Sequence, residues 1–241
     1  MERHVGGESV MDVEPLAPNV SWRSLYRAGA VSAVLYVALV VVAVVLVFAA
    51  PVPPAEGAAV LEYIAAHKAV YLTELICFVG LGVPALVVFT AAAVALKGAD
   101  KTMAVIGGLF GVCSEIIALS LGSSPESLHG GLVVLSDAYQ AAATDAHRAG
   151  LTSAADALVA ATNAVSWAGI LTAAAILVLS LVMHRTAFGK AVGVIGAVTG
   201  VAGILSEAFR PMIGPVYMVY GLLLPTWFAL VGWRLFRLAR P

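Results

Sequence analysis

Two glutamates end two copies of the same octapeptide, G-x-x-G-x-x-S-E, at residues 108–115 and 200–207. At about 100° per residue, the first and fourth positions and the glutamate share one face of a helix. Small residues on one face allow helices to pack closely, so we expect Glu115 and Glu207 to point into a helix bundle. A duplicated helical hairpin and a chance similarity between glycine-rich helices both explain the repeat.

Carboxyl groups inside apolar segments are the residues of this chain best suited to bind a ligand or a proton. A charged side chain at mid-helix costs about 2.5–3.5 kcal/mol on insertion scales, so such residues are functional candidates. Arg210 follows Glu207 by three residues, which allows a local ion pair, and Glu74 is shallow enough to reach the interface. Glu115 is deepest and has no local cation. We predict a site made by Glu74, Glu115 and Glu207, with Arg210 at its rim.

Metal and nucleophile chemistry have weaker support in the sequence. His129 and His147 are candidate metal ligands, but the chain has no HExxH or HxxxH motif. Ser114 and Ser206 lie about 100° around the helix from their glutamates, so we expect them to bond the preceding turn of their own helix. Walker A, Rossmann and kinase signatures are absent. We predict no bound metal and no cofactor, and catalytic residues, if the protein has any, are unknown.

Six apolar stretches of about 20 residues can position these groups, since each is long enough to cross a hydrocarbon core of about 30 Å as a helix. Apolar residues make up 61% of the chain and charged residues 11%. The alternating polarity of membrane barrel strands is absent. We therefore predict an all-α, polytopic bundle of six transmembrane helices, at residues 29–50, 70–96, 102–122, 162–183, 191–209 and 216–235.

Lys and Arg are divided unequally between the two sides of this pattern. If the chain starts in the cytoplasm and crosses at each stretch, only Lys68, Arg148 and Arg210 lie outside. Cytoplasmic loops accumulate Lys and Arg, so both termini should be cytoplasmic. The net charge of −1 gives no basic surface for nucleic acid. The residues expected inside are Arg3, Arg23, Arg27, Lys97, Lys101, Arg185, Lys190, Arg234, Arg237 and Arg240.

The chain divides into a tail and one membrane domain. Residues 1–20 are acidic and contain prolines, which predicts a disordered cytoplasmic tail. Residues 21–241 form the six-helix domain, with an outer helical segment near 123–161. A short helix near 55–67 is expected along the outer surface.

Several residues predict where helices begin, bend and end. The outer segment should form a helix near 125–149 that begins at Ser124 and stops at Gly150. Residues 153–156 resemble a capping box, which predicts the start of a long fourth helix there. Pro84 should kink the second membrane helix near its middle.

The membrane domain resembles a domain-of-unknown-function family of bacterial six-helix integral membrane proteins. This resemblance implies a six-helix bundle in the plasma membrane and transfers no catalytic residues. It rests on Tyr26-Arg27-Ala28-Gly29-Ala30, the alanine-rich stretch 138–161, the glycine-rich fifth helix after Phe188-Gly189-Lys190, and Pro225-Thr226-Trp227 before a basic tail.

The leading hypothesis is a membrane protein that binds or transports a small or lipid-like ligand through an outward-facing polar cavity lined by the three glutamates. One alternative is a membrane-embedded, metal-dependent hydrolase that acts on a lipid at the outer leaflet and uses His129, His147 and the same carboxylates. Another is a non-catalytic scaffold or accessory subunit, in which the glycine faces contact a second copy or another membrane protein. In each case the lipid bilayer is the permanent partner.

Overall fold

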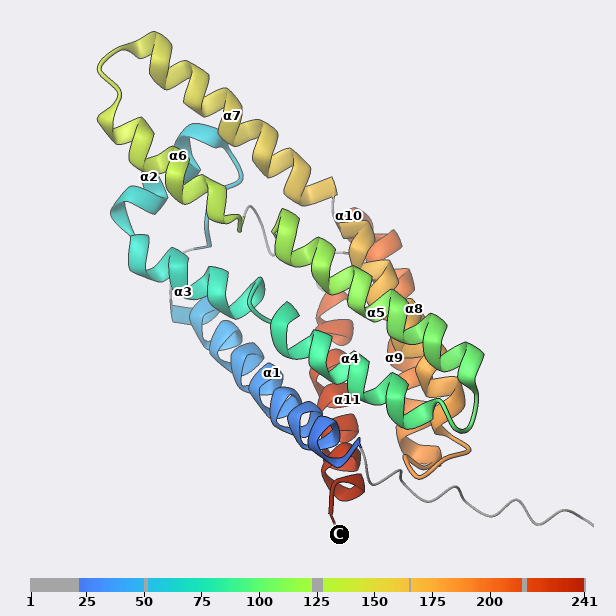
Figure 1. Ribbon diagram of the computed structural model, residues 1–241. Helices are drawn as coiled ribbons and strands as arrows, with labels where there is room; N and C mark the ends of the chain where they lie inside the picture. The colour runs from blue at the N-terminus through green and yellow to red at the C-terminus, as the bar shows by residue number, and fades with distance from the viewer. Residues whose placement is uncertain (1–21, 50–51, 123–127, 165, 214–215, 241) are drawn as a thin grey trace, which may run out of the picture.

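The computed structural model describes residues 22–49, 52–122, 128–164, 166–213 and 216–240, and its regular structure there is helical (Figure 1). The predicted tail, residues 1–20, lies outside this part of the chain. The helices are α1 (Arg23–Ala49), α2 (Gly57–Ala66), α3 (Lys68–Phe78), α4 (Gly82–Leu96), α5 (Lys101–Leu121), α6 (Gly130–Ala141), α7 (Asp145–Ala164), α8 (Ser166–Met183), α9 (Lys190–Ala208), α10 (Arg210–Ile213) and α11 (Tyr217–Leu238).

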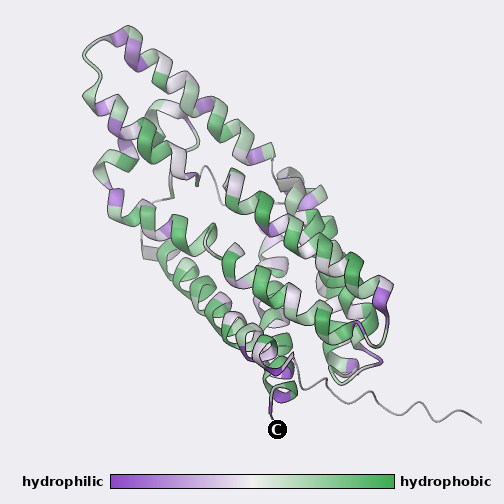
Figure 2. Ribbon diagram, in the orientation of Figure 1, coloured by the Kyte–Doolittle hydropathy of each residue, from purple (hydrophilic) through white to green (hydrophobic). Residues whose placement is uncertain are grey.

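Six stretches are long and apolar enough to cross a membrane, which confirms the predicted all-α architecture with six spans. They are α1, α3 with α4, α5, α7 with α8, α9, and α11. Apolar side chains such as Val31 and Val34 cover the outside of the bundle and are about 70% exposed. In Figure 2 the long helices are coloured mostly as hydrophobic along the bundle, and hydrophilic residues are more frequent toward its ends. The fold is that of a multi-pass membrane protein.

The start of α1 and the end of α11 lie at the same end of the bundle (Figure 1). The Lys97 ammonium, in the connection between α4 and α5, lies 4.6 Å from the ring centroid of Trp22. The core between these helices is aromatic and well packed. The rings of Tyr36 and Phe228 stack with their centroids 3.8 Å apart, and Phe89 packs edge-on against Phe228. The long helices therefore form one bundle around a shared core.

The second span is broken near its middle, as the sequence predicted. Helix α3 ends at Phe78 and α4 begins at Gly82, so the break falls at residues 79–81 around Gly80. Pro84 lies in the first turn of α4, where a missing amide hydrogen is tolerated. A proline ring clashes with the carbonyl of the residue four positions before it, which is Gly80, so the predicted interruption of this span near its middle is confirmed.

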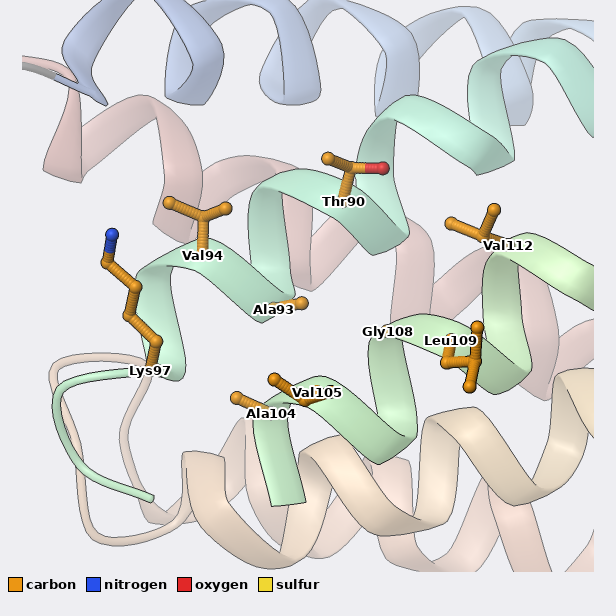
Figure 3. A pocket seen from close by; sticks show the side chains of 9 residues that line it. All are labelled: Thr90, Ala93, Val94, Lys97, Ala104, Val105, Gly108, Leu109 and Val112. Carbon is orange, nitrogen blue, oxygen red and sulfur yellow. The ribbon is translucent and has the colours of Figure 1, made fainter. Parts of the chain in front are cut away.

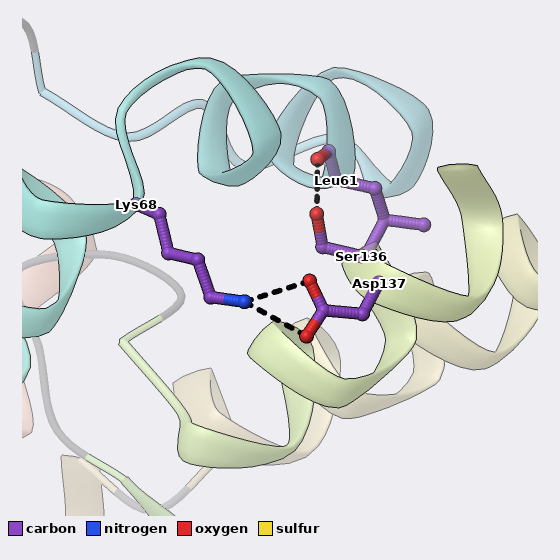
Figure 4. Close-up of polar contacts among 4 residues, drawn as sticks. All are labelled: Leu61, Lys68, Ser136 and Asp137. Atoms are coloured by element: carbon purple, nitrogen blue, oxygen red, sulfur yellow. Dashed lines mark hydrogen bonds and ion pairs between the residues drawn. The ribbon is translucent and has the colours of Figure 1, made fainter. Parts of the chain in front are cut away.

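Helices α2, α6 and α7 form a cap above one end of the bundle. Its own apolar core includes Leu61, Leu132 and Val159. Two polar contacts hold α6, one to α2 within the cap and one to the start of α3 (Figure 4). The Ser136 hydroxyl donates to the Leu61 carbonyl at 2.7 Å, and the Lys68 ammonium donates to both carboxylate oxygens of Asp137 at 2.8 Å. The predicted short helix near 55–67 is confirmed as α2.

The helix boundaries in the cap correct the sequence prediction. The expected helix near 125–149 is divided into α6 and α7 by residues 142–144, and its predicted start at Ser124 lies outside the described residues. Thr144 caps α7, since its hydroxyl oxygen accepts from the His147 amide at 3.2 Å. Gly150 lies inside α7, and so does the predicted capping box, where Ser153 donates to the Ala149 carbonyl. The helical stretch that contains the fourth span therefore starts at Asp145, in the cap.

Candidate functional site

Helix α8 packs between α5 and α9, the two helices that carry the octapeptide. Glycines make these contacts close. A Cβ atom at Gly107 of α5 would lie 2.7 Å from Leu179 Cγ, and one at Gly200 of α9 would lie 2.6 Å from Leu177 Cβ. Close packing of both helices on α8 places the glutamate of each copy against the same central helix. Glu115 and Glu207 are both buried, as the glycine faces predicted.

Glu115 is held by hydroxyl groups. The Thr172 hydroxyl of α8 donates to Glu115 Oε1 at 3.3 Å, and it also contacts the Ser114 hydroxyl. Ser114 donates to the Ala168 carbonyl of α8 at 2.6 Å. The expectation that Ser114 bonds its own helix is therefore wrong, because the close approach of α8 offers a nearer acceptor. No ion pair to Glu115 occurs among the described residues.

Glu207 has a different set of partners. The Tyr217 hydroxyl donates to Glu207 Oε1 at 2.7 Å, and Arg210 Nη1 lies 3.8 Å from Glu207 Oε2. This confirms the predicted local ion pair. The contact is too long for a hydrogen bond, and Glu207 Oε2 is buried without a hydrogen-bond partner in the structure. The Arg210 guanidinium also lies 4.8 Å from the centroid of the Tyr217 ring.

The two carboxylates contact α8 at positions about one helical turn apart. Gly169 lies beside Glu207, where an added Cβ would be 2.5 Å from the carboxyl carbon, and Thr172 binds Glu115. Three residues of helix correspond to about 4.5 Å. Tyr220 is buried, with 3% of its surface exposed, and interacts electrostatically with both carboxylates. The site therefore extends from Glu207, near the end of α9, inward to Glu115.

Sequence reasoning did not identify the tyrosines of this site. Tyr36 of α1 lies near Glu115, and Tyr220 of α11 lies near Glu207, to which Tyr217 donates its hydroxyl. A tyrosine on an apolar helix face needs a partner for its hydroxyl when buried. That requirement could have marked these tyrosines as candidates in the sequence, but it does not say which helix supplies the partner.

Glu74 belongs to a separate polar region. It is buried in α3, with 4% of its surface exposed. Its electrostatic neighbours are Tyr63, Tyr71 and Cys77, and not the residues around Glu115. Burial raises the pKa of the Tyr63 hydroxyl, and the Glu74 carboxylate raises it further. The structure thus divides the three predicted glutamates into a pair and a single residue.

The two candidate metal ligands have other roles or surroundings. His129 caps α6, because its Nδ1 accepts from the Gly131 amide at 2.9 Å. His147 is exposed on α7. In the part of the chain that the structure describes, no group of three or more His, Cys, Asp or Glu side chains is arranged to hold a metal. The geometry offers no support for the metal-dependent alternative.

An apolar groove lies between α4 and α5, away from the carboxylate pair (Figure 3). Its volume is about 350 Å³. The hydroxyl of Thr90 is already bonded to the Leu86 carbonyl, so the groove offers little polar chemistry. It is lined by Thr90, Ala93, Val94, Lys97, Ala104, Val105, Gly108, Leu109 and Val112.

Side chains fill the space around the carboxylate pair. A Cβ atom at Gly203 would lie 2.5 Å from the Tyr220 ring. A Cβ atom at Gly169 would lie equally close, at 2.5 Å, to the carboxyl carbon of Glu207. The site is therefore closed in this structure, and an outward-facing cavity remains a prediction.

Fold and site together define a class, the multi-pass helical membrane proteins with buried carboxyl groups in the bundle. Comparison of the chain with protein families, curated proteins and solved structures finds no match. The resemblance to a bacterial six-helix family therefore stays a prediction.

Proposed function

We propose that this protein binds or transports a small ligand at the site formed by Glu115, Glu207 and Arg210, reached from the outer end of the bundle. One observation carries the proposal. Two carboxylates from equivalent positions of two helices lie against the same helix α8, and Glu207 Oε2 is buried without a hydrogen bond. Burying an unpaired carboxylate oxygen is costly, and membrane proteins retain such groups at functional sites.

The termini belong in the cytoplasm and the cap outside, in a bacterial plasma membrane. The basis for this orientation is the charge distribution. Nine of the ten cations expected inside fall in the described part of the chain, and all nine are in the connections and helix ends on the side of Trp22 and Leu238. Cytoplasmic segments are enriched in such residues. The proposed membrane follows from the family resemblance.

This orientation can be tested by cysteine labelling. In a background with Cys77 and Cys113 replaced by alanine, Ala143→Cys in the cap and Ala99→Cys in the α4–α5 connection each place one exposed thiol. An impermeant maleimide should label the first in intact cells and the second only after lysis. The reverse pattern would contradict the orientation.

The scaffold alternative loses its main support. Its contact faces were the glycine faces of α5 and α9, and these are already covered inside the bundle. A Cβ at Gly111 would collide with the Phe89 ring of α4, and one at Gly203 would collide with Tyr220 and Ala173. These faces are therefore not free for a second protein.

Native mass spectrometry of the protein in mild detergent tests the ligand site. A mass bound to the wild type should be lost in Glu115→Gln and in Glu207→Gln. Glu62→Gln is the matched control, because Glu62 is exposed on α2 and the chemical change is identical. Equal spectra for all four proteins would contradict the proposal.

A further inference from the structure

We propose that the ligand of this site is a small organic cation of the guanidinium class, and that Arg210 is a tethered competitor for its place. This inference rests on the proposed function and adds the chemical class of the ligand. It starts from the open acceptor, Glu207 Oε2. The Glu207 side chain is 6% exposed, its Oε1 is bonded to Tyr217, and its Oε2 has no hydrogen bond.

Arg210 fills the place incompletely. Its Nη1 stays 3.8 Å from Glu207 Oε2, although its guanidinium lies over the Tyr217 ring at 4.8 Å. Arg210 therefore gives the site a positive charge and a contact with the Tyr217 ring, but it does not donate a hydrogen bond to Glu207 Oε2. Arg210 begins the short helix α10, only three residues after Glu207. This attachment restricts how the planar group can approach the carboxylate.

A free guanidinium carries no such attachment. Its planar set of N–H donors matches a carboxylate in a bidentate geometry, and its face can lie on the Tyr217 ring as that of Arg210 does. The same place therefore suits an untethered cation better than it suits Arg210. The Arg210 side chain is 26% exposed, so it can withdraw toward the outer end when a ligand enters.

The charges around the site favour a cation over an anion. Glu207 and Glu115 contact α8 at positions about one helical turn apart. Of the outer cations, Lys68 is paired with Asp137 and Arg148 is exposed on α7. Arg210 is thus the outer cation that contacts Glu207, and an anionic ligand there would meet the Glu207 carboxylate beside a single arginine.

The test is calorimetric titration of methylguanidinium into the protein in lipid nanodiscs, with methylurea as the uncharged ligand of similar shape. Arg210→Gln should bind methylguanidinium roughly tenfold or more tightly than the wild type, because the competitor is gone. Adding Glu207→Gln to that variant should abolish binding. Lys68→Gln is the control, since it removes an outer cation that is paired elsewhere, and it should leave the affinity unchanged.

Equal or weaker binding by Arg210→Gln would overturn the inference, and so would equal binding of methylurea. Binding of acetate to the wild type that is lost in Arg210→Gln would show an anion site, which overturns the ligand class and leaves the proposed function standing. If no variant binds methylguanidinium and native mass spectrometry finds no ligand, both proposals fail. Should Arg210→Gln fold poorly, Arg210→Met provides the same loss of charge and carries the same expectation.

Discussion

The two copies of the octapeptide place identical residues in different surroundings. On α5, Glu115 meets the Thr172 hydroxyl and no cation among the described residues. On α9, Glu207 meets the Tyr217 hydroxyl and the Arg210 guanidinium. The motif therefore fixes the inward direction of the glutamate, while the neighbouring helices determine its partners. The same eight residues support two different carboxylate environments.

The largest difference between the two copies is expected when the first glycine of each, Gly108 or Gly200, is replaced by alanine. A Cβ at Gly200 would lie 2.7 Å from the Leu177 amide nitrogen and 2.8 Å from the Ala173 carbonyl oxygen, so α8 and α9 must separate. A Cβ at Gly108 meets Ala93 Cβ at 2.7 Å. We expect Gly200→Ala to lower the free energy of unfolding by about 3 kcal/mol and Gly108→Ala by about 1 kcal/mol.

Unfolding by SDS in mixed micelles measures both variants. Gly221→Ala on α11 is the matched control, because nothing lies within 4 Å of the added Cβ. It should be neutral or stabilising, since alanine favours a helix over glycine. Equal losses for Gly200→Ala and Gly108→Ala would mean that the backbone contact of α9 with α8 contributes no more to stability than the side-chain contact of α5 with α4.

Removing the Thr172 hydroxyl tests how much the partners of Glu115, the glutamate of α5, contribute to stability. Thr172→Val keeps the shape of the side chain but leaves Glu115 Oε1 and the Ser114 hydroxyl without this partner. We expect a loss of about 2 kcal/mol in the free energy of unfolding, measured by the same SDS titration.

Thr199→Val is the control for that change. Thr199 is buried on α9, but its hydroxyl bonds only the Ile195 carbonyl of its own helix. A loss as large as that of Thr172→Val would show that any buried threonine in this bundle has the same effect.

Neutralising each glutamate should change stability in opposite directions. Glu115→Gln removes a buried carboxyl group with no ion pair in the described chain, so we expect a gain of about 1 kcal/mol. Glu207→Gln removes the partner of Arg210, so we expect a loss of about 1 kcal/mol. Thermal unfolding of both variants measures the difference, and shifts of the same sign would contradict it.

The smallest effect is expected at the exposed ion pair between α3 and the cap. Lys68 and Asp137 make a shorter contact than Arg210 and Glu207, at 2.8 Å, but their side chains are 47% and 63% exposed. Lys68→Gln should cost at most about 0.5 kcal/mol and less in high salt. A larger loss in thermal unfolding experiments would mean that the cap depends on this ion pair.

The sequence predicted those features that depend on helix periodicity and local spacing. Six apolar stretches gave the six spans, the glycine faces gave the burial of Glu115 and Glu207, and the i,i+3 spacing gave the pair with Arg210. Each of these depends on residues within one helix. Periodicity states which side of a helix is buried, and this information was sufficient for them.

Features that join distant residues were not predictable in this way. Glu115 and Thr172 are 57 residues apart, and no pattern within α5 indicates that α8 supplies the donor. Glu74 was grouped with the other glutamates because depth alone placed it near them. The start of α7 at Asp145 also escaped prediction, since the capping box at residues 153–156 was locally a stronger signal.

The bond between the Gly57 amide and Asp156 sets an order of events during synthesis. Its 2.6 Å contact joins the first turn of α2 to the middle of α7, 99 residues later in the chain. At about 5–20 residues per second, the ribosome needs roughly 5–20 s to supply the second partner. For most of that interval α2 is present without α6, and throughout it without a complete α7, the two helices that bury its apolar side. The cap is therefore completed only after the nascent chain has reached its fourth span.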